Sequence, residues 1–370
     1  MTFVIPCLFG LEGLVGDEVR RLGMEQVQVE NGRVLCEGGA QDLAKLNLNL
    51  RCGERVLLKV GEARTESFDE LYQAALALPW EDYIDREGQF PVKGYSLNSK
   101  LFALPNCQRN IKAAMAARLG RVYGMKQLPE TGAMHQVRFA LRNDVAEFYL
   151  DTSGAGLRKR GYRALSLEAP LRESLAAAMV LLSRYRGRDP FCDPFCGSGT
   201  IPIEAAMIAL NRAPGLMRHF DAQQWQCLPQ DIWRLAKEEA KDKEFHGSYK
   251  IWGGDIEARA IELAKENARK AGVSEHIRFE VADATKFRRD EPYGRIVTNP
   301  PYGERLMEKS EAEALYRAFG KAVRTLPEGW RVSVLSSHTE FERSFGKDAD
   351  RKRKLYNGMI KCDLFQYGKK

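Results

Sequence analysis

The stretch Asp193-Pro194-Phe195-Cys196-Gly197-Ser198-Gly199-Thr200 decides the fold. It follows a short apolar run at 190–192 and opens a helical pattern from Ile201 to Leu210. This order predicts a strand, a glycine turn and a helix. Two glycines let the backbone approach a ligand closely, since they carry no Cβ. The helix that starts there has unpaired N–H groups and a positive dipole end, so the turn can cradle a carboxylate or a phosphate.

The glycine turn alone does not identify the ligand. It is not Gly-x-Gly-x-x-Gly, because Ile201 and Pro202 occupy the region of the third glycine, and it is not Gly-x-x-x-x-Gly-Lys. Beyond Asp189 the apolar patterns alternate, with strands near 190–193, 249–254, 277–282, 294–298 and 330–336 and helices near 198–210, 257–271 and 310–325. This alternation predicts a parallel, doubly wound sheet with ligands outside the carboxyl ends of the strands.

Two segments depart from that alternation. Residues 212–248 form an insertion that contains tryptophan and many charges. Near the end of the chain, Asn357-Gly358 separates two strand-like runs. That pair indicates a hairpin, so we expect the last strand to run antiparallel.

The N-terminal half predicts two smaller α+β units. Residues 1–65 read as β-α-β-β-α-β, which is the order of a ferredoxin-like unit. Residues 66–163 form a second unit, in which a helix at 106–123 has an apolar face. A connector rich in glycine and basic residues ends this unit, and a third domain then covers 164–370.

Composition narrows the classes of protein. A chain of 370 residues suits two or three domains, and 44% hydrophobic residues is ordinary for a globular protein. No run approaches the ~18 apolar residues of a membrane span, and no basic region precedes the apolar N-terminus. The eight cysteines show no Cys-x-x-Cys, so we expect reduced thiols and no metal site. We therefore expect a cytoplasmic protein without a membrane partner.

Basic residues are concentrated in three clusters. Although the net charge is only +7, the segment Gly88–Pro129 has seven bases and no acid. The other clusters are Arg158-Lys159-Arg160 with Arg163, and Arg351-Lys352-Arg353-Lys354. Each alone can be a solvated surface, but three together favour a polyanion partner contacted through its phosphates. The predicted contact residues are Lys93, Lys100, Arg109, Lys112, Arg118, Arg158, Lys159 and Arg160.

Three acids follow consecutive strand ends: Asp193, Asp255 and Asp283. A carboxylate after the second strand can accept from both hydroxyls of a ribose, and one after the third can accept from an adenine amino group. Together with the glycine cradle they suit an adenosine-containing ligand, either a nicotinamide dinucleotide or S-adenosylmethionine. Each acid alone could equally be a helix N-cap.

Asn299-Pro300-Pro301-Tyr302 separates these two ligands. It follows the strand 295–298, and its two prolines stiffen the loop and remove two N–H donors. The Asn299 side-chain oxygen and the Pro300 carbonyl can both accept from one exocyclic amine, while Tyr302 stacks on the base that carries it. This holds the nitrogen lone pair toward an electrophilic methyl group, a device that a dehydrogenase does not need.

These two motifs resemble those of the THUMP-domain RNA methyltransferases, in particular the guanine-N2 methylases of large-subunit (23S) ribosomal RNA. The run Ala169-Pro170-Leu171-Arg172-Glu173 is similar to the helix that enters that family's catalytic domain, and Arg212-Ala213-Pro214-Gly215 to its insertion. The resemblance implies a Rossmann-like class I methyltransferase domain with a mostly parallel seven-stranded sheet. Ferredoxin-like and THUMP domains would precede it.

The resemblance also implies roles by position. The methionine part of S-adenosylmethionine would lie against Asp193, Pro194, Phe195, Gly197, Ser198, Gly199 and Thr200. The nucleoside would lie against Asp255, Ile256, Asp283 and Ala284, and Asn299 would border the cofactor. Asn299, Pro300, Pro301 and Tyr302 would receive the target guanine. Many relatives carry an acid where this chain has Gly294, a departure that should touch neither ligand.

Other functions stay open at this point. The same chemistry could act on guanine in transfer RNA, on adenine in DNA or RNA, or on a glutamine side chain. A non-catalytic RNA-binding assembly factor would be a different class, and a nicotinamide oxidoreductase is the reading that the motif favours least. The number of subunits does not follow from the sequence.

Overall fold

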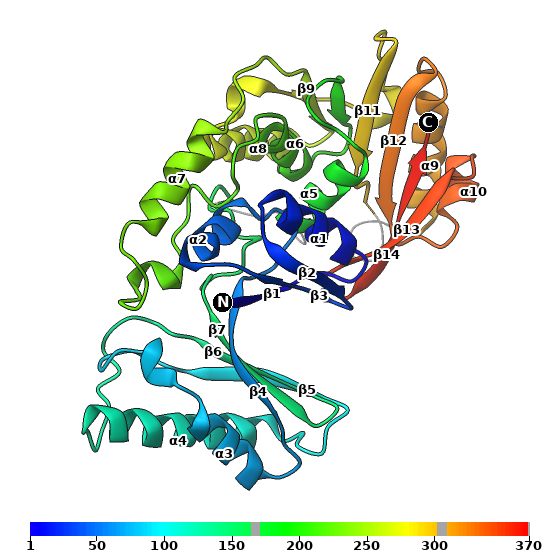
Figure 1. Cartoon of the computed structure of the whole chain (residues 1–370). Coiled ribbons are helices and arrows are strands. Elements are labelled where there is room, and N and C mark those ends of the chain that lie inside the picture. Colours follow the sequence, from blue (N-terminus) through cyan, green and yellow to red (C-terminus); the bar gives the residue numbers. More distant parts are fainter. Residues whose placement is uncertain (164–170, 302–308, 369–370) are drawn as a thin grey trace.

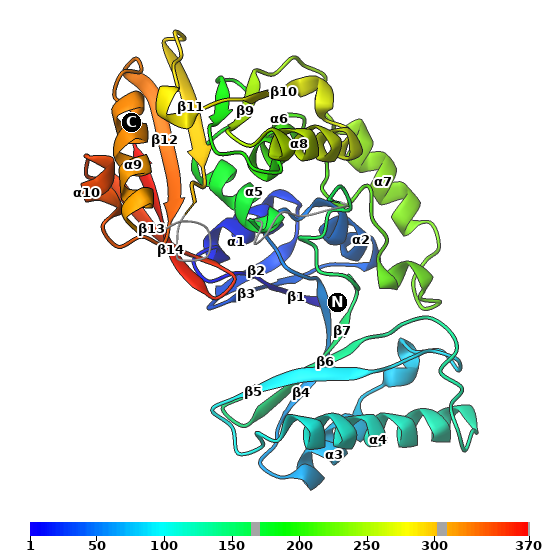
Figure 2. The ribbon, with the colours of Figure 1, turned by 180° about the vertical axis from the view of Figure 1, so that it is seen from behind.

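The computed structural model describes residues 1–163, 171–301 and 309–368, and two seven-stranded sheets organise them (Figure 1). Figure 2 shows from behind that the N-terminal sheet lies below the second sheet and its helices. Within the described ranges, no helix is both long enough and apolar enough to cross a membrane.

The first unit has the predicted ferredoxin-like order. Its elements are β1 (Thr2–Pro6), α1 (Glu12–Arg21), β2 (Glu25–Glu30), β3 (Arg33–Glu37), α2 (Ala40–Asn49) and β4 (Leu57–Arg64). The strands lie in the order β2-β3-β1-β4 and all pair antiparallel. Val15 and Val19, one helical turn apart on α1, are fully buried against this sheet.

The second unit continues the same sheet. It contains α3 (Phe68–Ala77), β5 (Val92–Leu97), α4 (Leu104–Tyr123), β6 (Val137–Arg142) and β7 (Val145–Asp151), with a short 3₁₀ helix at Trp80–Asp82. Strand β4 pairs with β1 on one side and with β7 on the other. The sheet therefore runs without a break as β2-β3-β1-β4-β7-β6-β5. The boundaries at 65/66 and 163/164 stay our proposal, and the first falls at the end of this shared strand.

The third domain is built on the second sheet. Its elements are α5 (Glu173–Leu182), β8 (Phe191–Asp193), α6 (Thr200–Ala209), α7 (Ile232–Asp242), β9 (Ile251–Asp255), α8 (Ala258–Ala271), β10 (Ile277–Val281), β11 (Tyr293–Thr298), α9 (Lys309–Val323), β12 (Gly329–Ser336), α10 (Phe341–Phe345), β13 (Arg351–Asn357) and β14 (Ile360–Tyr367). The strand order is β10-β9-β8-β11-β12-β14-β13, and β14 runs antiparallel to β12. This confirms the predicted parallel sheet with an antiparallel last strand.

Alternation along the strands gives this sheet two buried faces. Val297 joins the core that contains α5, α6 and α8, whereas its neighbour Ile296 joins the core beneath α9 and α10. Leu335 and Val334 divide in the same way on β12. A strand buried on both faces reads as a continuous apolar run, which is why these segments showed no polar alternation.

The insertion at 212–248 contains a helix, α7, that the sequence analysis did not predict. It packs on α2 of the ferredoxin-like unit. Before it, the Trp225 indole stacks on His135 and donates a hydrogen bond to the Met134 carbonyl at 2.9 Å. The insertion therefore connects the third domain to both N-terminal units.

Candidate active site

Asp193 ends β8 at the centre of the second sheet and is 1% exposed. Its Oδ1 accepts hydrogen bonds from the Thr298 hydroxyl at 2.6 Å and from the Phe195 N–H at 3.1 Å. Its Oδ2 is buried with no hydrogen-bond partner among the described residues. Burial, together with the nearby Asp255 carboxylate, raises the pKa of Asp193 to about 7. The Asp193 Oδ2 can therefore accept a hydrogen bond from a ligand.

The glycine turn that follows has the conformation that its residues predict. Gly197 and Gly199 have φ values of +52° and +83°, in the left-handed region that favours glycine. A Cβ on Gly199 would collide with Ala264 of α8, whereas one on Gly197 would meet no atom within 4 Å. Gly199 is therefore needed for packing, and Gly197 leaves the backbone open to a ligand. Pro194, Ser198 and Thr200 are buried around the turn, and Phe195 is partly buried.

Asp255 lies beside the turn at the end of β9, as predicted. Its Oδ2 accepts from the Gly197 N–H at 2.9 Å and its Oδ1 accepts from the Glu257 N–H at 3.0 Å. Each carboxylate oxygen keeps capacity for a second donor. The next residue, Ile256, is 69% exposed, so an apolar side chain is available to cover a flat ligand.

Asp283 follows β10 and caps a short 3₁₀ helix that starts at Ala284. Its Oδ1 accepts from the Thr285 N–H and hydroxyl, which lowers the pKa of Asp283. Asp283 is therefore a helix N-cap, and its carboxylate still lies at the edge of the site. Strand β10 pairs with β9 such that Val281 lies opposite Asp255, so both acids stand at the same carboxyl edge.

The Asn-Pro-Pro segment stands at this edge too, because β8 and β11 pair in parallel. The Asn299 Oδ1 is buried and has no hydrogen-bond partner among the described residues. Pro300 is buried and Pro301 partly so, and the Pro301 carbonyl accepts from the Tyr316 hydroxyl at 2.7 Å. Tyr316 is fully buried, so the loop is fixed from beneath. Tyr302, which we expected to stack on the base, lies outside the described residues.

The residues present fit S-adenosylmethionine. The unpartnered Asp193 Oδ2 suits an ammonium donor, and the space above Gly197 suits a chain that passes close to the backbone. Asp255 offers carboxylate oxygens, and the exposed Ile256 offers apolar surface. We therefore expect the amino-acid part at the turn and the nucleoside beyond it.

One predicted RNA contact is wrong. Arg160 is 2% exposed, and its guanidinium donates to Glu204 of α6 and to the Leu157 carbonyl. The Tyr162 hydroxyl donates to the same carboxylate. A buried cation needs a partner of this kind, and no local sequence signal points to Glu204, which lies 44 residues away. Arg160 joins the connector to α6 and does not face a solvent partner.

Arg163, which belongs to the same basic cluster, also has a structural partner that the sequence analysis missed. It donates to the Thr200 hydroxyl oxygen at 2.7 Å and lies 3.5 Å from Glu173. Arg158 is partly exposed and Lys159 exposed. These two stay candidates for an RNA contact.

The basic helix α4 is less uniform than expected. Lys112 pairs with Glu130 at 2.6 Å and Arg118 pairs with Glu81, so acids from outside the acid-free segment neutralise them. Lys100 similarly pairs with Glu66. Arg109 is exposed, and within the described ranges its guanidinium donates a hydrogen bond to the Asn106 side chain and has no ion-pair partner.

Lys93 lies on the other side of the sheet from α4. It pairs in register with Arg138, whereas the next residue along β6, Phe139, joins the core beneath the helices. Lys93 is exposed there, so it stays a candidate contact but does not extend the wall that we expected from the helix.

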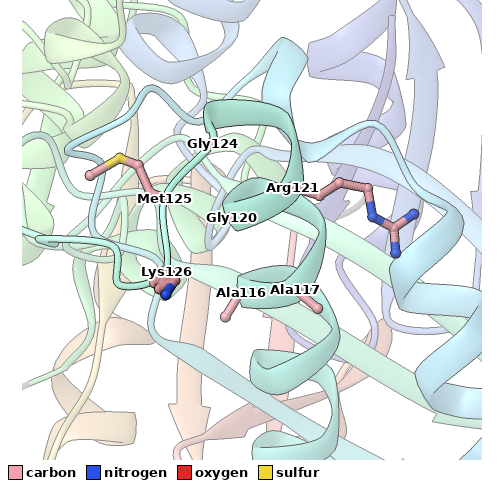
Figure 3. A pocket seen from close by; sticks show the side chains of 7 residues that line it. All are labelled: Ala116, Ala117, Gly120, Arg121, Gly124, Met125 and Lys126. Carbon is pink, nitrogen blue, oxygen red and sulfur yellow. The ribbon is translucent and has the colours of Figure 1, made fainter.

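A hollow of about 540 Å³ lies at the C-terminal end of α4. It is lined by Ala116, Ala117, Gly120, Arg121, Gly124, Met125 and Lys126, and Figure 3 shows Arg121 and Met125 on opposite sides of the helix. Arg121 and Lys126 are exposed and have no ion pair within the described ranges. This hollow is far in sequence and fold from the Asp193 turn, so we assign it to the N-terminal units and not to the catalytic site.

The strand order, the glycine turn, the three acids and the Asn-Pro-Pro loop define a class I methyltransferase that uses S-adenosylmethionine. The comparisons agree with this class. The family described as the RMKL-like methyltransferase domain matches residues 160–366, the RlmL ferredoxin-like domain matches 2–57, and the THUMP domain matches 65–151. The chain belongs to the RMKL-like methyltransferase family, which confirms the resemblance.

Named relatives and solved structures support the same class. The candidate RNA methyltransferase YpsC of Bacillus subtilis is 41% identical over 100% of this chain and 96% of its own. The ribosomal RNA large subunit methyltransferase K/L of Psychromonas ingrahamii is 35% identical over 99% of this chain, which spans 50% of that relative. SMU.472, a candidate methyltransferase solved with S-adenosylhomocysteine, is 39% identical with a TM-score of 0.94, covering 100% of this chain and 98% of that one.

A further solved structure carries a different description. A protein from Listeria monocytogenes described as a predicted N6-adenine-specific DNA methylase is 44% identical. It covers 100% of this chain and 96% of that one, with a TM-score of 0.94. All four descriptions name methyl transfer, whereas the targets that they name differ, with RNA in two of them and adenine in DNA in this one.

Proposed function

We propose that this protein methylates the exocyclic N2 amino group of a guanine in 23S ribosomal RNA. The single observation that carries the proposal is the Asn299 Oδ1 beside the Asp193 turn, which is buried and has no hydrogen-bond partner in the part of the chain that the structure describes. An orphaned buried acceptor costs stability unless a ligand supplies the donor. An exocyclic amine is such a donor.

The reaction follows from what these residues hold in place. S-adenosylmethionine, when bound, supplies an electrophilic methyl group on a sulfonium. The Asn299 Oδ1 and the Pro300 carbonyl accept the two amino hydrogens, so the nitrogen lone pair points away from both. Because the amine attacks while still carrying its protons, the site needs no strong base. After the transfer the nitrogen carries a positive charge, which it loses by giving its surplus proton to water.

The loop is stiff where this geometry demands it. Proline fixes its own φ, and two in succession restrict the loop further. The Tyr316 hydroxyl holds the Pro301 carbonyl, and Thr298 is anchored on Asp193. Such preorganisation avoids spending binding energy on ordering the acceptors during the reaction. Tyr302 would complete the pocket by stacking on the base.

RNA as the substrate is supported by the N-terminal units. The THUMP match, the basic surface residues Arg109, Arg158 and Lys159, and the RNA methyltransferases among the relatives all favour it. RNA bound through phosphates and shape suits such a surface. The target base must then leave its stack to reach Asn299.

Adenine N6 is the second candidate target. The Asn299 and Pro300 acceptors serve any exocyclic amine, and the Listeria monocytogenes structure carries that description. The ribosomal relative and the THUMP match favour RNA over DNA as the substrate, and guanine as the base rests on the resemblance to the guanine-N2 methylases. Transfer RNA guanine is a third target that the same surface could receive.

The deciding experiment compares ribosomal and transfer RNA from cells with and without the gene by nucleoside mass spectrometry. We expect one N2-methylguanosine in 23S RNA to disappear, and to return when purified protein and S-adenosylmethionine are added. Loss of an N6-methyladenosine, or of a transfer RNA modification, would replace the proposed substrate. No change in either RNA would favour an assembly factor without catalytic activity.

A further inference from the structure

We propose that the tip of the β13–β14 hairpin acts with Phe9 as an apolar wedge that fills the RNA stack when the target base leaves it. The inference rests on the proposed RNA substrate. It concerns a part of the chain that the cofactor and the Asn299 loop do not involve. The tip is Gly358-Met359-Ile360, and the whole group is called the wedge below.

The wedge exposes apolar side chains that the fold does not need. Met359 is 98% exposed, Phe9 is 60% exposed and Ile360 is 46% exposed. Gly358 has a φ of +65°, which permits the tight turn between the two strands. Met359 and Ile360 are neighbours at the tip, and Phe9 lies against Tyr356, three residues before Met359. Exposed large apolar side chains concentrated in one region are typical of a contact surface.

The wedge projects from the edge that carries the catalytic loop. Thr298 of β11 lies opposite Val334 of β12, and Ser336, at the end of β12, lies opposite Asp363 of β14. Ile360 is three residues beyond Asp363, which places the tip about 10 Å past the carboxyl edge at the usual strand rise. In Figure 1 and Figure 2 the hairpin extends past the arrowheads of β11 and β12 toward β3.

The hairpin is held firmly behind its tip. Leu355 and Cys362 face each other across the two strands and are buried at 0% and 1% exposure. On the other face, Tyr356 meets the ring of Phe9 edge-on, with 6.4 Å between centroids. A tip braced in this way can press on a ligand, since its rotational freedom is already restricted.

Cations surround the wedge. Lys354 and Lys361 are exposed on the two strands, and Arg351 is exposed further along β13. The Arg172 guanidinium lies 3.8 Å from the position that a Cβ on Gly358 would take. Lys352 is the exception, since it pairs with Glu342. An apolar point ringed by positive charge suits a polyanion that has apolar bases between its phosphates.

Removing a base from a stack is costly, and apolar side chains such as Met, Ile and Phe can occupy the gap between neighbouring bases. Enzymes that act on one base must meet this cost unless the base is already unstacked. The wedge should therefore speed methylation of a target base that is paired in a stem, and it should have little effect on a target base that is already unstacked. That dependence separates a wedge from an ordinary binding residue.

The test uses the double variant Met359→Ala/Ile360→Ala on two RNAs that contain the mapped target. In one RNA the target base is paired within a stem, and in the other it lies in a single strand. We expect kcat/KM to fall about tenfold or more on the stem and to stay within about twofold of the wild type on the single strand. A 2-aminopurine beside the target should show a smaller fluorescence rise when the variant binds the stem.

The matched control is Phe245→Ala, which removes an exposed apolar side chain (58% exposed) outside the wedge and should change neither RNA's kinetics. Equal losses on both RNAs, or none on either, would overturn the wedge. Dissociation of a dimer in the variant, seen by sedimentation with unchanged kinetics, would overturn it by assigning the tip to contact with a second copy. A wild-type protein that methylates no RNA would instead refute the proposed function, and the wedge with it.

Discussion

The Thr298 hydroxyl donates a hydrogen bond of 2.6 Å to Oδ1 of Asp193, across 105 positions of sequence. Thr298 immediately precedes Asn299, and Asp193 begins the glycine turn. One buried hydrogen bond thus connects the ends of β11 and β8. The end of β11 is followed by the proposed amine acceptor, and the end of β8 is followed by the proposed cofactor turn. We expect the two ligands' positions to depend on it.

Thr298→Val should remove this hydrogen bond while nearly preserving the shape of the side chain. The Asp193 Oδ1 would keep only the Phe195 N–H, and a buried acceptor that loses a donor costs about 1–3 kcal/mol. We expect a lower free energy of unfolding in urea, weaker S-adenosylmethionine binding by calorimetry, and about tenfold slower methyl transfer. Thr298→Ser retains the hydroxyl and should stay close to the wild type. A Val variant with unchanged kinetics would show that the link has no role in the reaction.

Asp193→Asn should alter the pH dependence of stability in the absence of cofactor. Burial raises the pKa of Asp193 from 3.8 to about 7. The folded wild type therefore holds a proton that the unfolded chain has lost, and its stability falls as the pH rises from about 4 to about 7. Asn cannot ionise and keeps an acceptor for Thr298, so the variant's Tm advantage should grow across that window and then level off. Its cofactor affinity should fall.

The control for this titration is Asp283→Asn. The Thr285 hydroxyl and N–H lower the pKa of Asp283, so its ionised form is the one that the fold favours. This variant should lose stability at neutral pH, opposite in sign to Asp193→Asn. Parallel Tm profiles for the wild type and Asp193→Asn would contradict the titration that we assign to Asp193.

Asn299→Ala should stop methyl transfer without releasing the cofactor. The variant removes an oriented acceptor from the amine, and loss of one preorganised hydrogen bond in an active site slows reactions by about 100-fold or more. Calorimetry with S-adenosylhomocysteine should give a Kd within about threefold of the wild type. Loss of cofactor affinity together with activity would instead place Asn299 in the cofactor site alone.

Arg109→Ala/Arg121→Ala should weaken RNA binding in a salt-dependent way. Both cations are exposed on α4 with no acid paired to them within the described ranges. Each phosphate contact that is lost lowers the slope of log K against log salt by about 0.7–0.9, so we expect a total decrease of about 1.5.

Arg118→Ala is the matched control on the same helix. Its guanidinium already pairs with Glu81, so this variant should leave the salt slope unchanged and change the free energy of unfolding only slightly, because surface ion pairs contribute little. An equal slope for the wild type and the Arg109/Arg121 variant would remove α4 from the RNA-binding surface.

The sequence predicted the catalytic domain well because its signals are local. A glycine turn after a short apolar run, and an acid after each strand, lie within a few residues of the backbone that they direct. Parallel pairing then brings their carboxyl ends to one edge. Asp193, Asp255 and Asn299 therefore stand together without any long-range information in the prediction.

The features that could not be predicted from the sequence are contacts between residues that lie far apart along the chain. The segment Gly88–Pro129 has no acid of its own, yet Glu81 and Glu130 reach its bases through the fold. Arg160 read as part of a surface cluster, and only the packing of α6 supplies Glu204. Likewise, the sequence predicts β4 as the last strand of the first unit, whereas in the structure β4 pairs with β1 of the first unit and with β7 of the second.

The central claim is that an amine held by Asn299 and Pro300 faces a methyl donor held by the Asp193–Thr200 turn. A crystal structure with S-adenosylmethionine bound tests this most directly. We predict the amino-acid part within hydrogen-bond reach of Asp193 Oδ2, the ribose at Asp255 and the methyl group directed toward Asn299 Oδ1. A cofactor bound elsewhere, or with its methyl group directed away from the Asn299 loop, would contradict the account.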